Sequence, residues 1–274
     1  MYLLKKINLD DAWQKEQGWN EERKSGRKFD DRKELEFWEK LAPHSEQYNL
    51  YRDVPGLKEK IFSLIGENSS VLDLGCGSGN FTIPLAPRCR EILALDFSPA
   101  MLDQLTLKIR ENGISNVRTV CSKWEDFSKP WDADYVLAVN SLYRVCYMRE
   151  ALKKIALYGR KGFVIVRTLL KPLMYSIYED LGLNYRRNND YMLMPLMLWD
   201  MGIHANVEFM EYTRTCTYEN REKVEAEMIR DLGELSYMNF NNQLEEKFLH
   251  TAEKKNDGYH YISRRVVQMI WYSN

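Results

Sequence analysis

The middle of the chain alternates short apolar runs with segments of helical periodicity. The runs are rich in Val, Ile and Leu and are bounded by turn residues, as is typical of strands that are covered on both faces. They predict strands at residues 71–74, 91–95, 117–121, 134–139 and 162–167. Between these strands, helices are predicted at 99–112 and 149–157. The pattern therefore predicts an α/β fold.

Residues on both sides of this central pattern predict further helices. Leu35, Trp38 and Leu41 stand at helical spacing in segment 30–41, and Pro43 ends this helix. A second helix, from 55 to 65, leads into the first strand. Beyond the fifth strand, the chain predicts helices at about 171–181, 190–201, 221–234 and 241–254, and strands at 206–218 and 264–272.

A glycine-rich turn directly after the first predicted strand is the strongest local signal. Gly75, Gly77 and Gly79 follow Asp73, and an apolar segment at 81–86 opens a helix. Glycine has no Cβ, so it adopts positive φ and lets a ligand approach the backbone closely. Free N–H groups at the helix start then face the ligand. This strand, turn and helix start together predict a nucleotide-binding site.

A second acidic residue stands where the ribose of a nucleotide is expected. Asp96 ends the second strand, 21 residues after Gly75. Its two carboxylate oxygens can accept hydrogen bonds from both ribose hydroxyls. Ser98 follows as the expected N-cap of the next helix, and Pro99 as its first residue. The dinucleotide pattern G-x-G-x-x-G is not met, because its sixth position is Asn80.

These two motifs resemble those of the Rossmann-like, class I S-adenosylmethionine (SAM)-dependent methyltransferases. The similar stretches run from Asp73 to Gly79 and from Leu95 to Leu102, and the resemblance covers roughly residues 57–168. It implies a doubly wound, mostly parallel seven-stranded sheet with a helical N-terminal cover and helical insertions after the fifth and sixth strands. It also implies an enzyme that transfers a methyl group from the cofactor SAM.

The resemblance implies that the glycine-rich turn, the neighbouring strand ends and the loop after the third strand hold the cofactor. Asp73 is expected near the methionine ammonium group. Trp124 is expected against the adenine, with simple core packing as the alternative, and Lys123 stands where the family commonly has an acid. The expected cofactor-binding residues are Asp73, Gly75, Cys76, Gly77, Asp96, Phe97, Ser98, Met101, Trp124, Glu125, Asn140 and Ser141.

We predict a single methyltransferase domain over residues 1–274, because the chain shows no internal repeat and no low-complexity linker. Residues 1–55 are expected to form the helical cover and 56–168 the cofactor-binding core. Residues 169–274 are expected to form a cap insertion and the C-terminal strands. Segments 1–55 and 169–190 are predicted to close over the cofactor, because methyl transfer gains from the exclusion of water. The alternative is that both segments pack on the back of the sheet.

Aromatic and arginine side chains suggest a flat or anionic small-molecule acceptor. The candidate acceptor-binding residues are Tyr48, Tyr51, Tyr143, Arg144 and Tyr185. No catalytic residue is predicted, because positioning two reactants can by itself supply about 7–11 kcal/mol of a reaction barrier. Two other functions stay open: a SAM-binding regulatory or scaffold protein, and a methyltransferase that acts on RNA or protein.

Composition narrows the class of protein further. The formal net charge of −1 gives no general attraction for a phosphate backbone, so no nucleic-acid partner is expected. Five scattered cysteines without a C-x-x-C pair predict reduced thiols, and no metal site is expected. No run of 18 apolar residues occurs and the first residues lack an apolar core, so neither a membrane span nor a signal peptide is expected. These features predict a cytoplasmic protein.

Overall fold

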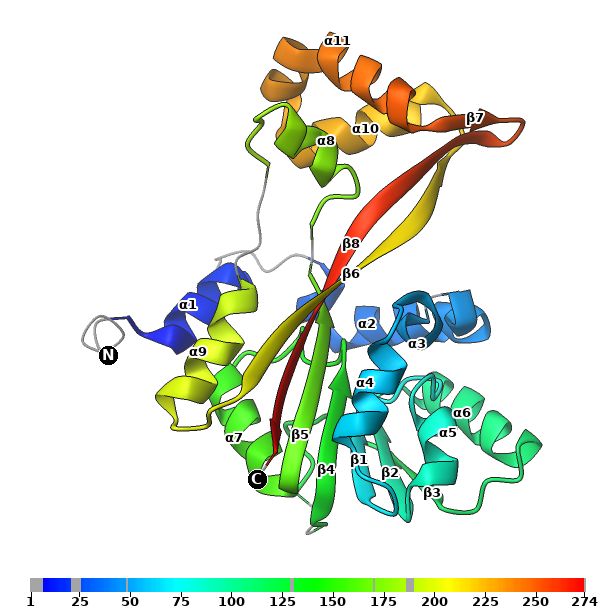
Figure 1. Ribbon diagram of the computed structural model, residues 1–274, viewed down its shortest axis with the longest axis vertical. Coiled ribbons are helices and arrows are strands. Elements are labelled where there is room, and N and C mark those ends of the chain that lie inside the picture. The colour runs from blue at the N-terminus through cyan, green and yellow to red at the C-terminus, as the bar shows by residue number, and fades with distance from the viewer. Residues whose placement is uncertain are drawn as a thin grey trace. The chain divides into compact units, whose positions relative to one another are not determined.

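The structure is a computed structural model that describes residues 7–20, 26–47, 49–128, 131–169, 171–185 and 190–273, apart from the side chains of Gln47 and Tyr51 (Figure 1). The strands are β1 Ser70–Leu74, β2 Glu91–Asp96, β3 Val117–Cys121, β4 Ala133–Val139, β5 Gly159–Thr168, β6 Asn206–Tyr218, β7 Glu253–Lys255 and β8 Gly258–Ser273. The α-helices are α1 Leu9–Glu16, α2 Asp31–Leu41, α3 Leu50–Asp53, α4 Leu57–Leu64, α5 Thr82–Leu85, α6 Pro99–Glu111, α7 Met148–Tyr158, α8 Tyr175–Asp180, α9 Leu193–Asp200, α10 Arg221–Leu232 and α11 Glu234–Thr251. Short 3₁₀ helices are η2 Arg27–Phe29, η3 Ala42–Gln47, η4 Ala86–Arg88 and η5 Asp190–Met192.

The strands form one sheet in the order β3-β2-β1-β4-β5-β8-β6, and β7 pairs with β8. β1 runs parallel to both β2 and β4, β2 runs parallel to β3, and β4 runs parallel to β5. Strand order reverses between β1 and β4, and open sheets of this kind bind ligands in the crevice at such a switch point. The predicted doubly wound, mostly parallel α/β fold is confirmed.

The number of strands differs from the prediction of seven, because the described residues form a sheet of eight. The additional strand is β7, which the sequence pattern placed in a helix that ended near residue 254. β7 forms an antiparallel hairpin with β8, in which Lys255 faces Gly258. Asn256 and Asp257 form the two-residue loop between them, and Asn, Asp and Gly are the residues that tight hairpin turns prefer.

Some helices also begin or end at other residues than predicted, and a glycine or a proline explains these differences. α10 ends at Leu232 because Gly233 has a φ of 83°, and α11 begins at once instead of near residue 241. α8 begins at Tyr175, after a turn that follows Pro172. Within the described residues, the structure contains no helix that combines the length and the apolar character needed to span a membrane.

Helices cover both faces of the parallel part of the sheet. On one face, Leu93 and Leu95 of β2 belong to a core cluster that also contains residues of α1, α7 and α9. On the opposite face, Ala94 packs with Leu102 and Leu105 of α6. This alternation along β2 is what a strand covered on both faces requires. The sheet edge where ligands bind is therefore held by two separate packed layers.

The chain divides into two compact units. The first comprises Met1–Arg167, Asn189–Met210 and Gln268–Asn274, and the second comprises Thr168–Asn188 and Glu211–Val267. β6 and β8 contribute residues to both units, so the second unit is an insertion in the chain of the first. Its buried core is rich in tyrosine and contains Tyr175, Tyr178, Tyr185, Tyr218, Tyr237, Tyr259 and Tyr261. The single domain stays a prediction.

Candidate functional site

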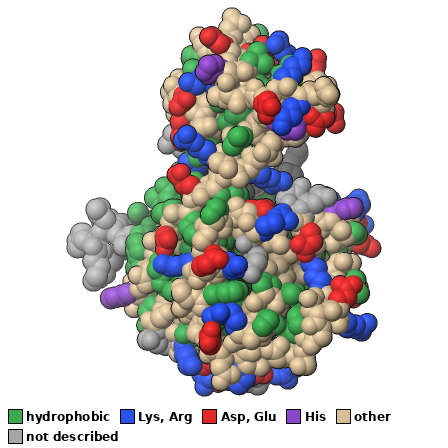
Figure 2. Space-filling view, turned by 45° about the vertical axis from the view of Figure 1, so that its right-hand side comes forward, with side chains coloured by type: hydrophobic (Ala, Val, Ile, Leu, Met, Phe, Trp, Pro, Cys, Tyr) green, Lys and Arg blue, Asp and Glu red, His purple; other side chains and the backbone are tan. Residues whose placement is uncertain are grey.

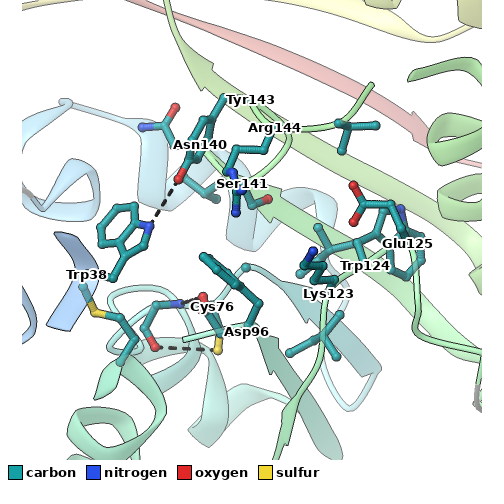
Figure 3. Close-up of a pocket in the computed structure, with 18 of the residues that line it drawn as sticks. Trp38, Cys76, Asp96, Lys123, Trp124, Glu125, Asn140, Ser141, Tyr143 and Arg144 are labelled. Atoms are coloured by element: carbon teal, nitrogen blue, oxygen red, sulfur yellow. Dashed lines mark hydrogen bonds between the residues drawn. The ribbon is translucent and has the colours of Figure 1, made fainter. Parts of the chain in front are cut away.

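The first unit contains a cavity of about 1110 Å³ at the carboxyl ends of β1, β2 and β4 (Figure 3). This volume slightly exceeds the range of about 300–1,000 Å³ that is usual for small-molecule sites. One part of the wall is the predicted cofactor edge of the sheet. Another part comes from the N-terminal segment, namely Trp19, Arg27, Lys28, Phe29, Asp31, Phe37, Trp38, Leu41, Ser45 and Leu50.

The glycine-rich turn after β1 is held by its own backbone and by its neighbours. Gly75 N–H and Cys76 N–H donate to the carbonyl of Leu95 at 2.7 and 3.0 Å. Gly75 has a φ of 70°, and a Cβ there would lie 2.2 Å from the Cβ of Ser141. Gly77 has a φ of 54° and no atom within 4 Å of an added Cβ. Gly75 therefore allows the strands to approach, whereas Gly77 leaves cavity space free.

Asp96 connects the end of β2 to the glycine-rich turn (Figure 3). One carboxylate oxygen accepts the N–H of Gly77 and the other accepts the N–H of Ser98, both at 2.9 Å. Burial raises the pKa of Asp96, and these backbone hydrogen bonds oppose the rise. Each oxygen keeps a second acceptor position. Asp96 can therefore organise the turn and also accept hydroxyl groups of a ligand.

Asp73 is a second carboxyl group on the cavity wall, and it is 3% exposed. Thr82 Oγ1 donates to it at 2.5 Å. Burial raises the pKa of Asp73 to about 7, and the nearby charge of Asp96 contributes to the rise. Within the described part of the chain, no basic side chain forms an ion pair with Asp73. Two buried carboxyl groups without a paired cation suit a positively charged ligand.

The loop after β3 supplies another part of the cavity wall. Trp124 and Glu125 both line the cavity, and Trp124 also stacks on Phe127 at a centroid distance of 6.2 Å. The Nζ of Lys154 lies 4.3 Å from the centre of the Trp124 ring. These contacts are consistent with both interpretations of Trp124, contact with the ligand and packing in the core.

The end of β2 and the start of α6 bring the next predicted residues to the same edge of the sheet. Phe97 and Met101 line the cavity. Ser98 does not appear on the wall; its hydroxyl caps α6 by accepting the N–H of Met101 at 3.4 Å, and its own N–H donates to Asp96. Ser98 therefore acts on the site through Asp96 and the start of α6.

The end of β4 places Asn140 and Ser141 on the cavity wall. Asn140 has a φ of 51°, which is uncommon for a residue other than glycine and which clusters at functional sites. Its N–H donates to the carbonyl of Val166 at 2.8 Å. Within the described residues, Ser141 Oγ and Trp124 Nε1 are buried without a hydrogen-bond partner. Buried polar atoms of this kind are expected where a polar ligand completes a site.

Tyr143 and Arg144 line the cavity and contact the N-terminal segment (Figure 3). Arg144 Nη2 lies 2.7 Å from the carboxylate of Asp31, which also pairs with Lys123. These two ion pairs lower the pKa of Asp31, and its hydrogen bond to Lys123 has the largest effect. Asp31 is the first residue of α2, so its ion pairs tie this helix to the loops after β3 and β4.

The roles of the remaining acceptor candidates stay predictions. Tyr185 lies in the second unit, where its buried ring packs on Tyr178 and its hydroxyl donates to Glu179 at 2.6 Å. Tyr48 and the side chain of Tyr51 lie outside the described residues. No described residue of segment 169–190 lines the cavity. Within the described residues, the N-terminal segment contributes to the cavity wall, and the closure of both segments over the cofactor stays a prediction.

Sequence reasoning missed Glu34 and Asp31 of α2. The apolar positions Leu35, Trp38 and Leu41 suggested that the buried face of this helix is apolar. The structure leaves these three side chains partly exposed, and within α2 the buried residue is Glu34. Acidic residues are common beside the apolar stripe of an amphipathic helix, where they usually face solvent. The sequence pattern therefore did not indicate that Glu34 is buried.

Comparisons with known proteins agree with the geometry. Residues 71–162 match the family model described as a methyltransferase domain. An uncharacterised protein from Haemophilus influenzae is 30% identical over 175 residues, which cover 62% of this chain and 64% of that protein. A tRNA/tmRNA (uracil-C(5))-methyltransferase from Pseudomonas entomophila is 39% identical over 69 residues, 25% of this chain and 19% of that protein. The chain thus spans less than two thirds of each of these two relatives.

A solved structure shows the same fold over a larger part of the chain. This structure, a SAM-dependent methyltransferase from Aquifex aeolicus, superposes with a TM-score of 0.50 and 12% sequence identity. The superposition covers 85% of this chain and 97% of the other. At this level of identity, the likeness shows the fold and leaves the acceptor open.

Proposed function

We propose that the chain is a Rossmann-like, class I SAM-dependent methyltransferase, and that it methylates a small-molecule acceptor bound between the cofactor edge of the sheet and helix α2. The volume of the cavity carries this proposal, since about 1110 Å³ can hold a second molecule beside a nucleotide-sized cofactor. Bound SAM supplies a methyl group on a positively charged sulfur atom. The protein must position the acceptor on the axis of that methyl group and exclude water.

The residues of the cofactor edge suit SAM in charge and shape. Two buried carboxyl groups, Asp73 and Asp96, complement the ammonium and sulfonium charges and the ribose hydroxyls. Gly77 leaves space for the ligand. The residues proposed to hold the cofactor are Asp73, Gly75, Cys76, Gly77, Asp96, Phe97, Met101, Trp124, Glu125, Asn140 and Ser141, with Ser98 acting through Asp96.

A small acceptor fits the face shown in Figure 2 better than RNA does. Lys and Arg side chains alternate with Asp and Glu on the face shown in Figure 2, without a continuous basic stripe. A protein that binds a phosphate backbone usually gathers its basic residues along one path. The cited RNA methyltransferase relative matches only 69 residues. RNA or protein methylation and a purely regulatory SAM-binding role are the alternatives that the experiments below separate.

We expect calorimetry to show that the purified protein binds SAM and S-adenosylhomocysteine with 1:1 stoichiometry. The reason is that the proposed cofactor-binding residues line a single cavity of the described structure. Mass spectrometry of co-purified ligands, followed by a metabolite panel incubated with SAM, is expected to reveal one methylated small molecule. A protein that gives no binding heat with either ligand but responds to NAD would refute the assignment. Methyl transfer to bulk RNA but to no metabolite would favour the RNA alternative, and binding without any transfer would favour the regulatory one.

Replacing Asp96 with alanine is expected to weaken SAM binding by roughly 10- to 150-fold. The substitution removes charge-assisted hydrogen bonds to buried hydroxyls, which contribute about 1.5–3 kcal/mol. Calorimetric titration measures the effect, and far-UV circular dichroism confirms that the variant folds. Asp103→Ala, at an exposed position of α6, is the matched control and should bind SAM like the wild type. Unchanged affinity in a folded D96A variant would remove Asp96 from the site.

A further inference from the structure

Helix α2 buries a carboxylate where a helix normally buries an apolar side chain. Glu34 is fully buried, and it is the buried residue of α2. Its Oε1 accepts hydrogen bonds from Trp38 Nε1 at 2.8 Å, from Arg27 Nη1 at 3.1 Å and from the hydroxyl of Tyr143. Its Oε2 has no partner within the described residues. Removing a carboxylate from water is costly even when it is paired, so this position calls for an explanation.

The three side chains that donate to Glu34 all line the cavity. Among them, Tyr143 has an acceptor position to spare. Its hydroxyl donates to Glu34 and accepts Trp38 Nε1 at 3.2 Å, and a hydroxyl oxygen can accept two hydrogen bonds (Figure 3). Burial and the charge of Glu34 raise the pKa of Tyr143, so the hydroxyl keeps its proton. One lone pair of a neutral hydroxyl can therefore accept a donor from a bound molecule.

Many of the side chains that line the cavity are aromatic, and the described basic groups have partners within the protein. The aromatic side chains that line the cavity are Trp19, Phe29, Phe37, Trp38, Phe81, Phe97, Trp124, Tyr143 and Tyr147. Among the described lining residues, Arg27 pairs with Glu34, Lys123 and Arg144 pair with Asp31, Lys154 donates to the carbonyl of Trp124, and Lys28 donates to the carbonyl of Gln17. The described basic groups of the wall are therefore committed to partners within the protein. Such a wall favours a planar, uncharged molecule over an anion.

We propose that the acceptor is a neutral planar molecule whose O–H or N–H group donates to Tyr143, and that Glu34 receives the acceptor's proton through Tyr143. This inference rests on the proposed function. The O–H or N–H bond of the acceptor breaks, its proton moves to Tyr143 Oη, and the original Tyr143 proton moves to Glu34. The acceptor keeps the electron pair that forms its bond to the methyl carbon, while the sulfur–carbon bond breaks and leaves its pair on sulfur.

The charges balance in this scheme. A cationic methyl donor, a neutral acceptor and a Glu34 carboxylate give a neutral sulfide, a neutral methylated product and a neutral Glu34 carboxyl group. Tyr143 is the group that contacts the acceptor, and Glu34 acts through it as a positioning residue and proton acceptor. Within the described residues, Arg27 of η2 and Tyr143 of the loop after β4 are the ionisable groups in contact with Glu34.

The test uses 2-naphthol and the 2-naphthoate anion as probes. In the presence of S-adenosylhomocysteine, the wild type should bind 2-naphthol at least roughly tenfold more tightly than 2-naphthoate in calorimetry. With SAM, it should form the methyl ether of 2-naphthol. Glu34→Gln keeps an oxygen that can accept from Tyr143, so its dissociation constant for 2-naphthol should stay within about threefold of the wild type. Its turnover rate should fall by roughly 100-fold or more and should rise with pH as 2-naphthol ionises in solution.

Two more variants separate a structural role from a chemical one. Tyr143→Phe should weaken 2-naphthol binding by roughly three- to tenfold, because one hydrogen bond is lost. Glu39→Gln, at an exposed position of α2, should behave like the wild type. Equal binding of the two probes, no binding of 2-naphthol, or an E34Q variant that loses binding and rate together would overturn the inference. A wild type that binds no SAM in the same calorimeter would refute the proposed function instead.

Discussion

A Gly75→Ala variant is expected to lose about 2–5 kcal/mol of its free energy of unfolding. A methyl group at this position would lie 2.2 Å from the Cβ of Ser141, and the φ of 70° disfavours any residue with a Cβ. The left-handed conformation costs about 1–2 kcal/mol and overpacking about 1–3 kcal/mol. Urea denaturation followed by tryptophan fluorescence measures the change. The affinity for SAM should fall as well, because the turn and the end of β4 must separate.

Two other glycines act as matched controls for this experiment. Gly113 has a φ of 62° with open space around a built Cβ, so Gly113→Ala should cost only about 1–2 kcal/mol and leave SAM binding unchanged. Gly77 combines a similar φ with a place on the cavity wall. Gly77→Ala should therefore match Gly113→Ala in stability but lose SAM affinity. Equal stability of the Gly75 and Gly113 variants would contradict the close approach of Gly75 and Ser141.

SAM binding is expected to release a proton from Asp73 at pH values below 7. Burial holds the pKa of this carboxyl at about 7 in the ligand-free protein, and a bound cation lowers the pKa of a neighbouring acid. The free protein is then protonated and the complex ionised, so affinity should rise by up to roughly tenfold per pH unit between pH 5 and 7. Calorimetry in buffers of different ionisation enthalpy measures both the proton release and the affinity.

Asp73→Asn provides the comparison for this pH dependence. The amide keeps an oxygen that can accept from Thr82 but cannot ionise. Its SAM affinity should be lower than that of the wild type at pH 7 and nearly independent of pH between 5 and 7. If the wild type also binds SAM with a pH-independent affinity over this range, Asp73 is not the carboxylate that interacts with the positive charge of SAM.

The sequence was sufficient to predict the backbone geometry of the glycine-rich turn and the neighbouring strand ends, because the pattern there is local. The turn at Gly75, Gly77 and Gly79 requires positive φ, and all three glycines have it. Ser98 caps α6 as the motif predicted. Parallel strands bring their carboxyl ends to one edge, so Asp73 and Asp96 had to lie near each other once the strands were recognised. Their roles toward SAM stay predictions.

The opposite wall of the cavity could not be predicted in the same way. Glu34 and Tyr143 are separated by 109 residues, and Asp31 and Arg144 by 113. No local pattern connects residues at such separations, and an isolated helix gives no reason to bury a carboxylate. The position of Tyr185 likewise depends on contacts between distant residues, since it lies in the core of the second unit, and its role as an acceptor-binding residue stays a prediction.

The sequence by itself determined the parallel core, the glycine-rich turn, the N-cap of α6 and the residues expected at the cofactor edge. These features follow from backbone conformation and from periodicities of two and 3.6 residues, which a few neighbouring positions express. Only the tertiary structure decided that Asp31 ties α2 to the loops after β3 and β4, and that Glu34 is the buried residue of this helix. These contacts are between charged groups far apart in the chain, and their free energy depends on burial, which exists only in the folded protein.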